Sequence, residues 1–458
     1  MRKLLPFMLA FLLLFTTGCQ SKPPAVGQEQ VPLTPERVEE LYALSQQFTE
    51  YLNTNNINAA MEMMDETVSD AMDGKMESTW KQLCDSMGGF IKTGSYVGSS
   101  SQGYDAIEMT LSFNKGNMIQ RIVFDSDNLI SGLWFRNGEV DPAIELKLPE
   151  GVKESDVTVD AGEDYALPGK LTLPENGTPV AAVVLIHGSG PNDMNETIGT
   201  NNPFKDLAYG LAQNGIAVLR YDKRSYTYGA ALAEQGSEIS IDEEVASDAL
   251  AAVKLLKSRD DINSDNIYLL GHSMGAGLLS YINSKGADCA GYIVMAGSPR
   301  SLWELSADQN LLIADEMEQS GDNKQAEEIR EFVRNERIRA EGLADLKGDE
   351  TVFGMPASYL QSLGKIDTIS LHMNDGLPML VLQGEKDRQV SMKDFTLWQE
   401  GLSTHPKATF ASFPTLNHLF GEYVGNPVLF SKIVDVEYAQ KTPVSDEIIT
   451  AITNWING

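Results

Sequence analysis

The sequence predicts a doubly wound α/β domain with a mostly parallel sheet, preceded by a small α+β domain. After about Lys153, short apolar runs alternate with helical segments, as in sheets whose strands are buried on both faces. A Gly-x-Ser-x-Gly pentapeptide, Gly271 to Gly275, joins one of these runs directly to a helical segment. Between residues 34 and 140, helices are followed by three strand-like runs, which indicates the smaller domain.

The first residues predict export. Two basic residues precede an apolar run over 4–15, which is too short to span a bilayer but fits a signal-peptide core. Thr16-Thr17-Gly18-Cys19 resembles the lipobox of bacterial lipoproteins, although Leu is preferred at its first position. We expect a signal peptide over 1–18, a diacylglyceryl group on Cys19 and a polar tether over 19–33. The protein would then be anchored to the outer face of the cell membrane, with secretion as the alternative.

The smaller domain, over 34–140, begins with a predicted helix. Thr34 is a candidate N-cap, Pro35 suits the first helical turn, and apolar residues follow at helical spacing. Helical stretches continue to about Phe90, and strands are predicted over 106–113, 118–125 and 129–135. No catalytic constellation is found in this domain. Binding or positioning is its expected role, and a solvated spacer is the alternative.

The larger domain, over 150–458, contains five apolar runs that predict buried strands: 181–187, 216–222, 266–270, 292–296 and 378–383. Helices are predicted between them, at 204–213 and at 241–257. Ser240 and Glu243 have the spacing of a capping box at the start of the second helix. This alternation is typical of a doubly wound fold.

A charged helical stretch interrupts the alternation over about 300–375. Its position after one core strand and before the next predicts a lid over the site. The alternative is a solvated helical pair away from the site.

Ser273 is the candidate nucleophile. It stands at the centre of the pentapeptide, between the strand that ends before Gly271 and the helix that follows Gly275. A strand-to-helix turn this sharp forces its central residue into a strained conformation and exposes the hydroxyl, while flanking glycines avoid clashes. The alternative is a serine at an ordinary tight turn.

A serine hydroxyl needs a base to take its proton, and the base needs an acid to orient it. In sites of this kind the acid follows a late strand and the histidine follows the last strand. Asp387 comes after the strand at 378–383, with Glu385 as the alternative acid. His418 follows the predicted final strand at 408–413.

The same chemistry needs donors for a developing negative charge. His187-Gly188-Ser189-Gly190-Pro191 ends an earlier strand, and its glycines let a backbone N–H turn towards a substrate carbonyl. We expect the oxyanion hole to be formed by the N–H groups of Ser189 and Met274. A loop that only makes a turn is the alternative.

Five segments carry a resemblance to a known family: HGSGPNDMNETIG, NPFKDLAYGLAQNGIAVLRYDKRSY, GHSMG, LQGEKDRQV and LNHLF. Together they resemble a subgroup of bacterial α/β-hydrolase esterases that carry a small N-terminal domain of unknown function, cystatin- or NTF2-like in fold. The resemblance implies the α/β-hydrolase fold and carboxylesterase activity on short acyl chains. Asp193, Glu196, Tyr221 and Arg224 lie in these segments without an assigned role, and ion pairs that hold loops are expected for them.

Composition excludes several other functions. The chain has 458 residues, with 35 Lys+Arg against 65 Asp+Glu and a net charge of −30, so nucleic acid is not an expected partner. No Walker loop, His-Glu-x-x-His or Cys-x-x-Cys motif is present, and neither metal nor nucleotide cofactors are expected. Besides Cys19, we expect Cys84 and Cys289 to be buried free thiols, with a bridge between them as the alternative.

The sequence therefore predicts a serine hydrolase acting on a small-molecule ester. His418 would deprotonate Ser273, Asp387 would fix the imidazole tautomer, and water would release the acyl group. A peptidase or acyltransferase with the same three residues is one alternative. A binding protein whose pocket holds a ligand without chemistry is the other.

Overall fold

The computed structural model describes residues 33–458 apart from 73, 102–103, 139–147, 163–164, 176–178, 199–200, 230–239, 348–349, 426–427 and 439–441. The described residues form two compact units that divide between 147 and 148, and each is described by itself. The predicted signal peptide and Cys19 lie outside the described residues. Within the described ranges, no helix is both long and apolar enough to cross a bilayer.

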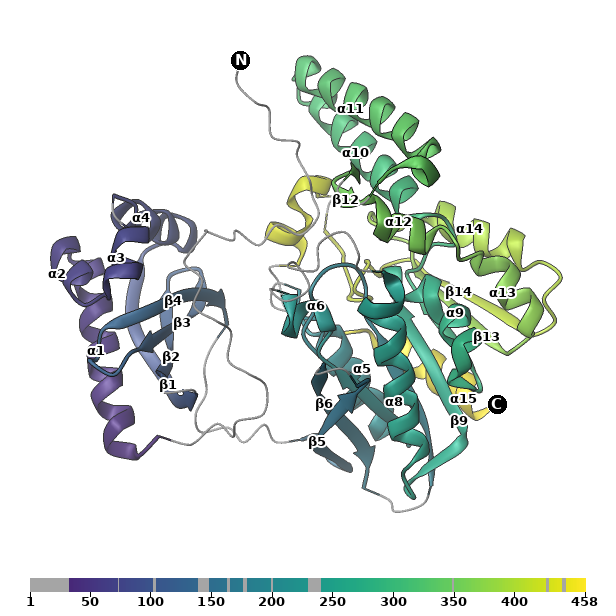
Figure 1. Cartoon of the computed structure of the whole chain (residues 1–458), viewed down its shortest axis with the longest axis horizontal. Helices are drawn as coiled ribbons and strands as arrows, with labels where there is room; N and C mark the ends of the chain where they lie inside the picture. Colours follow the sequence, from purple (N-terminus) through teal and green to yellow (C-terminus); the bar gives the residue numbers. More distant parts are fainter. Residues whose placement is uncertain are drawn as a thin grey trace. The chain divides into compact units, whose positions relative to one another are not determined.

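The smaller unit consists of helices followed by an antiparallel sheet (Figure 1). Its helices are α1 (Pro35–Asn53), α2 (Ile57–Glu62), α3 (Glu66–Met72) and α4 (Met76–Met87). Its strands pair in chain order and are β1 (Phe90–Ser101), β2 (Tyr104–Phe113), β3 (Gly116–Phe124) and β4 (Ile130–Asn137). The hydroxyl of Thr34 accepts from the N–H of Arg37 at 3.3 Å and caps α1.

One face of this sheet forms the core of the smaller unit. Alternate residues of β2, including Ile107, Met109 and Leu111, are fully buried against apolar residues of α1 such as Leu41 and Phe48. The period of two along the strand explains why these side chains share a face. The core of the smaller unit therefore consists of its own residues.

The larger unit contains an eight-stranded sheet in the order β14-β13-β10-β9-β7-β8-β6-β5. Its strands are β5 (Val152–Asp160), β6 (Ala166–Pro174), β7 (Val180–Ile186), β8 (Ala217–Tyr221), β9 (Ile262–His272), β10 (Gly291–Met295), β13 (Met379–Gly384) and β14 (Ala408–Phe413). Neighbouring strands pair in parallel from β14 to β8, whereas β6 pairs antiparallel with both β8 and the edge strand β5. The predicted mostly parallel sheet of the α/β-hydrolase fold is confirmed.

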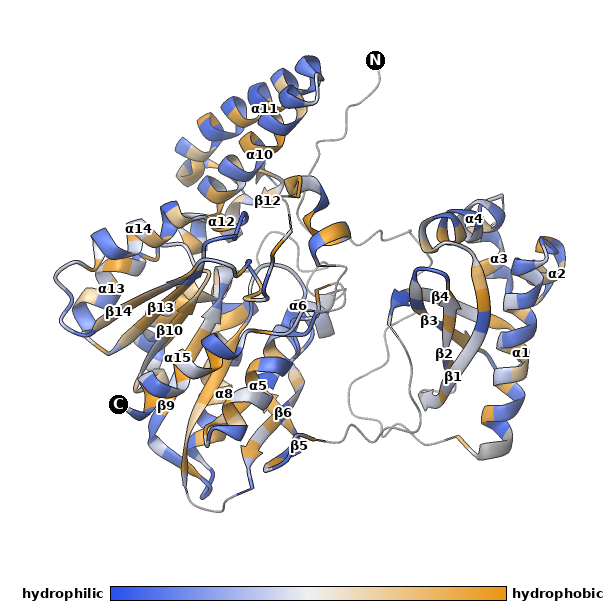
Figure 2. Cartoon of the chain, turned by 180° about the vertical axis from the view of Figure 1, so that it is seen from behind, coloured by the Kyte–Doolittle hydropathy of each residue, from blue (hydrophilic) through white to orange (hydrophobic). Residues whose placement is uncertain are grey.

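Helices cover both faces of this sheet. Val183 and Leu185 of β7 pack against α5 (Pro203–Gln213) and α15 (Asp446–Asn457). Val184 and Ile186 point to the opposite layer, whose helices are α8 (Ser247–Lys257), α9 (Leu279–Ile282) and α14 (Met392–Gly401). Figure 2 shows the strands as largely hydrophobic between these helices, as expected for a sheet buried on both faces.

A helical insertion separates β10 from β13. It contains α10 (Leu302–Gln319), α11 (Asn323–Glu341), a two-stranded ribbon of β11 (Thr351–Val352) and β12 (Met355–Pro356), α12 (Ala357–Leu363) and α13 (Thr368–Asp375). The last helix packs on the main core through Ile369 and Met373, and Thr368 Oγ1 donates to Gly277 O at 2.9 Å. In the predicted lid region, α13 is therefore part of the helical layer of the sheet.

Candidate active site

Ser273 lies at the turn between strand β9 and the 3₁₀ segment η3 (Ser273–Leu278). Its φ is +53°, a left-handed conformation that non-glycine residues rarely adopt and that costs free energy. The side chain is only partly buried. The turn therefore has the strained backbone that the pentapeptide predicted for Ser273.

The two glycines of the pentapeptide stand where backbone segments meet. A Cβ on Gly271 would lie 2.5 Å from Ala276 N, and a Cβ on Gly275 would lie 2.4 Å from Ile186 O at the end of β7. Neither position has room for a side chain. Close packing of η3 against the ends of β7 and β9 thus explains the spacing of the glycines around Ser273.

His418 and Asp387 lie side by side in two loops that follow β14 and β13. His418 Nδ1 is 2.7 Å from Asp387 Oδ2, and both residues are buried. Asp387 Oδ1 accepts from the N–H groups of Gln389 and Val390 at 2.8 and 2.9 Å. Gln383 Nε2 donates to Asp387 Oδ2 at 3.0 Å. Because the carboxylate holds the Nδ1–H of His418, the other ring nitrogen, Nε2, is left for proton transfer.

The His418 loop contacts the turn that carries Ser273. The ring centroids of His418 and His272 are 4.6 Å apart, and His272 Nε2 lies 2.9 Å from His418 O. Since His272 directly precedes Ser273, the structure brings the loops of Ser273, Asp387 and His418 together. Glu385, the alternative acid, is exposed and accepts from Ser412 Oγ at 2.8 Å.

Glu196 forms a buried ion pair beside the turn, as expected for it from the sequence, although its partner His272 was not predicted. His272 Nδ1 is 2.9 Å from Glu196 Oε2, and Glu196 Oε1 accepts from the N–H of Gly188 at 2.7 Å. Burial opposes protonation of His272, but the Glu196 carboxylate outweighs this effect and raises the pKa of His272. The Glu196 carboxylate therefore favours the charged form of the His272 imidazole. The Glu in HGSGPNDMNE was the available sequence signal, and we expected only an ion pair there.

The other segments of the resemblance are held by similar contacts. Arg224 forms a two-fold pair with Asp248 at 2.6 and 3.0 Å, and Asp193 accepts from the N–H groups of Asn195 and Thr197. Tyr221 is buried in β8 with its ring edge-on to His187.

The predicted oxyanion loop runs past the nucleophile. A Cβ on Gly188 would lie 3.2 Å from Ser273 Cβ, so this backbone touches the turn. Ser189 is exposed, and no group in the described part of the chain accepts from its N–H. Met274 starts the turn of η3 that follows the nucleophile. Of the two predicted donors, Met274 therefore directly follows Ser273, and Ser189 follows a glycine that lies against it.

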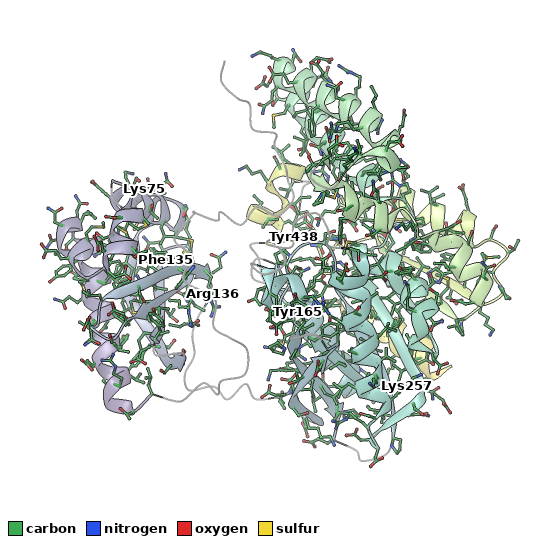
Figure 3. The ribbon with its side chains drawn as sticks, viewed as in Figure 1. Lys75, Phe135, Arg136, Tyr165, Lys257 and Tyr438 are labelled. Carbon is green, nitrogen blue, oxygen red and sulfur yellow. The ribbon has the colours of Figure 1, made fainter. Side chains whose placement is uncertain are left out.

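An apolar cluster covers the loops of Asp387 and His418. Leu419 packs with Ile198, with Ile313 of α10, and with three residues of the C-terminal segment: Phe430, Ile433 and Tyr438. Figure 3 labels Tyr438, whose hydroxyl accepts from Gln389 Nε2 at 2.7 Å. This segment comprises η6 (Phe430–Lys432) and η7 (Ile433–Glu437).

Helix α10 is hydrogen-bonded to the acid loop. Gln309 Nε2 donates to Gln389 O at 3.0 Å. The buried Glu316 accepts from Arg388 Nη2 at 2.8 Å and from the N–H of Phe430 at 2.7 Å. Helix α10 of the insertion thus contacts the loop of Asp387 directly.

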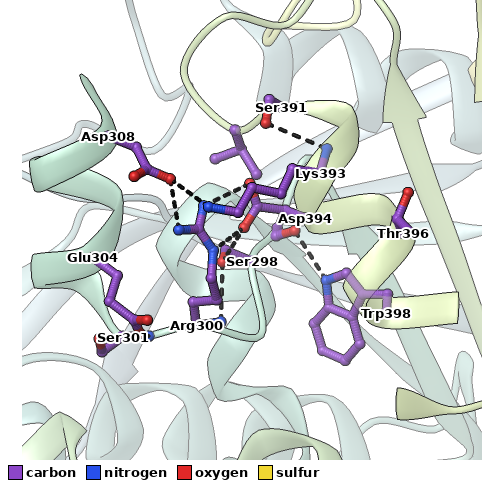
Figure 4. Close-up of polar contacts among 12 residues, drawn as sticks. Ser298, Arg300, Ser301, Glu304, Asp308, Ser391, Lys393, Asp394, Thr396 and Trp398 are labelled. Carbon is purple, nitrogen blue, oxygen red and sulfur yellow. Dashed lines mark hydrogen bonds and ion pairs between the residues drawn. The ribbon is translucent and has the colours of Figure 1, made fainter. Parts of the chain in front are cut away.

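A second ion cluster fixes the start of the insertion to α14 (Figure 4). Asp394 is fully buried and accepts from Ser298 Oγ at 2.6 Å and from Arg300 Nε and Nη2 at 2.8 and 3.0 Å. Arg300 Nη1 and Lys393 Nζ lie 2.8 and 2.9 Å from Asp308 of α10. Arg300 therefore joins the end of β10, helix α10 and helix α14.

The described ranges contain two cysteine thiols, Cys84 and Cys289. There, no group of three or more His, Cys, Asp or Glu side chains could hold a metal ion. Cys289 is buried and Cys84 half-buried, and both are free thiols. Burial raises the pKa of the Cys289 thiol to about 12.

Comparisons with known families match both units. A family model described as serine aminopeptidase, S33, matches residues 177–421, and a model described as a protein of unknown function, DUF3887, matches residues 45–133. Esterase EstD of Thermotoga maritima is 32% identical over 415 residues, which are 89% of this chain and 93% of that protein.

Two solved esterases are more distant. Esterase Pf2001 of Pyrococcus furiosus has 14% identity and a TM-score of 0.40 over 67% of this chain and 91% of its own. Est1E of Butyrivibrio proteoclasticus has 15% identity and a TM-score of 0.41 over 66% of this chain and 99% of its own.

Proposed function

Because this chain belongs to the family of α/β-hydrolase esterases that includes Esterase EstD, we propose that it hydrolyses short-chain carboxylic esters through Ser273, Asp387 and His418. The contact between His418 and Asp387, 2.7 Å long and beside the strained turn of Ser273, is the main support for this assignment. The donors beside Ser273 and the insertion over the acid loop suit an enclosed ester site.

In the proposed mechanism, His418 Nε2 takes the proton of Ser273 as the hydroxyl oxygen attacks the ester carbonyl carbon. Asp387 stabilises the imidazolium, and the N–H groups of Ser189 and Met274 bind the oxyanion of the tetrahedral intermediate. Collapse of the intermediate breaks the ester C–O bond, and His418 returns the proton to the leaving alcohol. Water then attacks the acyl-enzyme with the same base and releases the acid and free Ser273.

Replacement of the nucleophile tests this mechanism. Ser273→Ala should lower kcat by about 10⁶-fold on p-nitrophenyl butyrate, as nucleophile removal does in other serine hydrolases. Ser189→Ala is the matched control, because the proposed hole uses its backbone N–H, which alanine keeps. Residual turnover of Ser273→Ala within tenfold of wild type would rule out this nucleophile.

A peptidase is the second candidate, favoured by the description of the family model as a serine aminopeptidase. Rates on a series of p-nitrophenyl esters and on aminoacyl-p-nitroanilides distinguish the two, and we expect the esters to react faster.

A binding protein without chemistry is the third candidate. A fluorophosphonate that fails to label Ser273 in folded protein would support it over both enzymes.

We also propose that the protein is exported and anchored by a lipid on Cys19. The support is the sequence alone, namely the apolar run over 4–15 and the lipobox-like Thr-Thr-Gly-Cys. In a bacterial host, wild type should be found in the membrane fraction and Cys19→Ser should not. Cys84→Ser is the control, and equal membrane association of wild type and Cys19→Ser would contradict the anchor.

A further inference from the structure

Lys223 is a buried cation that contacts the predicted oxyanion loop. It follows β8 and is 3% exposed. Its Nζ donates to Gly188 O at 2.9 Å and to Gly190 O at 3.0 Å, and it lies 3.2 Å from Glu244 Oε1. These three acceptors use the three N–H bonds of the ammonium group.

The neighbouring Asn192 binds the same carbonyls. Its Nδ2 lies 3.1 to 3.3 Å from the carbonyl oxygens of Gly188, Ser189 and Gly190. The N–H of Lys223 donates to Asn192 O at 3.0 Å, which holds the two residues together. Three successive carbonyl groups of the loop therefore converge on Lys223 and Asn192.

The contacts to these carbonyl groups also determine the direction of the Ser189 N–H, one of the predicted oxyanion-hole donors. All described peptide bonds are trans, so the carbonyl of Gly188 and the N–H of Ser189 point in opposite directions. Lys223 holds that carbonyl, and Glu196 holds the N–H of Gly188. Gly188 lies against Ser273, and in the part of the chain that the structure describes the Ser189 N–H has no acceptor.

We propose that Lys223 is a positioning residue that orients the Ser189 N–H towards the carbonyl oxygen of the transition state. This inference rests on the proposed serine-esterase mechanism. A buried ammonium group must keep its partners, since an unpaired buried charge is very costly. Glu244 supplies the counter-charge and also accepts from Tyr359 Oη of α12 at 2.6 Å. The donor is thus oriented before substrate binds, as electrostatic catalysis requires.

Lys223→Met tests the role because methionine keeps an apolar stem but donates no hydrogen bond. We expect kcat on p-nitrophenyl butyrate to fall about 100-fold, the effect of losing one oxyanion donor. KM should stay within about threefold of wild type, because the ground-state carbonyl gains little from that donor.

Arg224→Met is the matched control. Arg224 is the next residue, is 4% exposed and is also ion-paired, but its partners are Asp248 and the ring of Tyr165, which Figure 3 labels. Among the described residues, Arg224 forms no hydrogen bond or ion pair with residues 188–190. This variant should lose stability while the folded protein keeps the wild-type kcat.

The affinity for a trifluoromethyl ketone distinguishes positioning of the oxyanion donor from a purely structural role of Lys223, because loss of a structural role alone would leave this affinity unchanged. This inhibitor forms a tetrahedral adduct with the serine and places an oxyanion in the hole. Its affinity should fall about 100-fold in Lys223→Met, in parallel with kcat/KM, and stay unchanged in Arg224→Met. If Lys223→Met does not fold, Glu244→Gln, which removes the counter-charge of Lys223, should show a smaller fall in both quantities.

The proposal is overturned if kcat and ketone affinity match wild type in the folded variant, or if only KM changes. Failure of the proposed function has a different signature. In that case, Ser273→Ala would keep activity, or wild type would show neither ester turnover nor ketone binding.

Discussion

Around Ser273, backbone contacts decide which residues are tolerated. A Cβ on Gly275 would lie 2.4 Å from Ile186 O and 2.5 Å from His187 O. Gly275→Ala should therefore push η3 away from β7 and lower the free energy of unfolding by about 2 to 3 kcal/mol, as overpacking does. Urea denaturation followed by tryptophan fluorescence measures the change.

Gly277→Ala is the control for this substitution. Gly277 lies in the same segment, but the nearest atom to its Cβ would be Ser298 O at 3.3 Å. A small shift can accommodate that contact, so the loss should be clearly smaller. Equal losses at the two positions would show that the close approach to β7 is not what requires Gly275.

His372 of α13 should make stability depend on pH. It is 1% exposed, its ring packs on Tyr292 and Trp398, and neither ring nitrogen has a hydrogen-bond partner among the described residues. Burial lowers its pKa to about 3, from 6.5, and His405 adds to the effect. Above pH 6.5 both the folded and the unfolded states keep the ring neutral. As pH falls from 6.5 towards 3, His372 becomes protonated in the unfolded state but stays neutral in the folded state. The free energy of unfolding therefore decreases.

The expected contribution of His372 is about 2 kcal/mol lost between pH 7.5 and pH 5. His372→Leu removes the titrating ring from an apolar site, so its unfolding free energy should fall by about 2 kcal/mol less than that of wild type over this range. Urea denaturation at the two pH values measures it. Met373→Leu, on the same helix, should keep the wild-type pH dependence, and the same dependence in His372→Leu would contradict the assignment.

The residues that the sequence could locate are those that follow a strand in a recognisable turn. Ser273, Asp387 and His418 were placed in this way, because parallel strands end at one edge of a sheet. The partner of Glu196 and the contacts of Lys223 were not predicted, since neither residue stands in a sequence motif that identifies its partners. Such contacts depend on how the loops pack, which local spacing does not encode.

At the scale of elements, α10 is held to the acid loop by one buried carboxylate. Glu316 is 6% exposed and accepts from Arg388 and from the N–H of Phe430. Glu316→Ala leaves both donors without their acceptor, and we expect the free energy of unfolding to fall by about 3 kcal/mol. The activity should also fall, because Arg388 adjoins Asp387. Urea denaturation and ester kinetics measure the two effects.

Glu318→Ala is the matched control on the same helix. Glu318 also pairs with an arginine, Arg330, but its side chain is 55% exposed. Exposed pairs of this kind contribute little, so no measurable loss of stability or activity is expected. Similar behaviour of the two variants would mean that the link between α10 and the acid loop is unimportant.

The strands that were predicted from the sequence are those with continuous runs of apolar residues. The core strands of the larger unit were placed within a few residues because both of their faces are buried. Strand β1 was not predicted, since its sequence, FIKTGSYVGSSS, is rich in Gly and Ser, and its pairing with β2 stabilises it instead. The edge strand β5 and its neighbour β6 were also missed, and β5, which is largely polar and exposed, has no continuous apolar run.

At the scale of the whole molecule, the two units have separate cores. The buried residues of the smaller core lie between 41 and 130, whereas the buried residues of the two large clusters around the eight-stranded sheet all come after 158. The loops of Ser273, Asp387 and His418 and the insertion also belong to the larger unit. A domain with its own core is expected to fold alone.

We therefore predict that residues 148–458, produced without the smaller unit, fold cooperatively and keep kcat/KM for p-nitrophenyl butyrate within about threefold of the full chain. Circular dichroism, thermal unfolding and ester kinetics on both proteins measure this. The same comparison with a longer acyl ester separates the two roles considered for the smaller unit. A loss confined to the longer ester favours substrate positioning, and equal kinetics favour a spacer. An insoluble or inactive fragment would contradict the independence of the two cores, since every residue assigned to the chemistry lies within it.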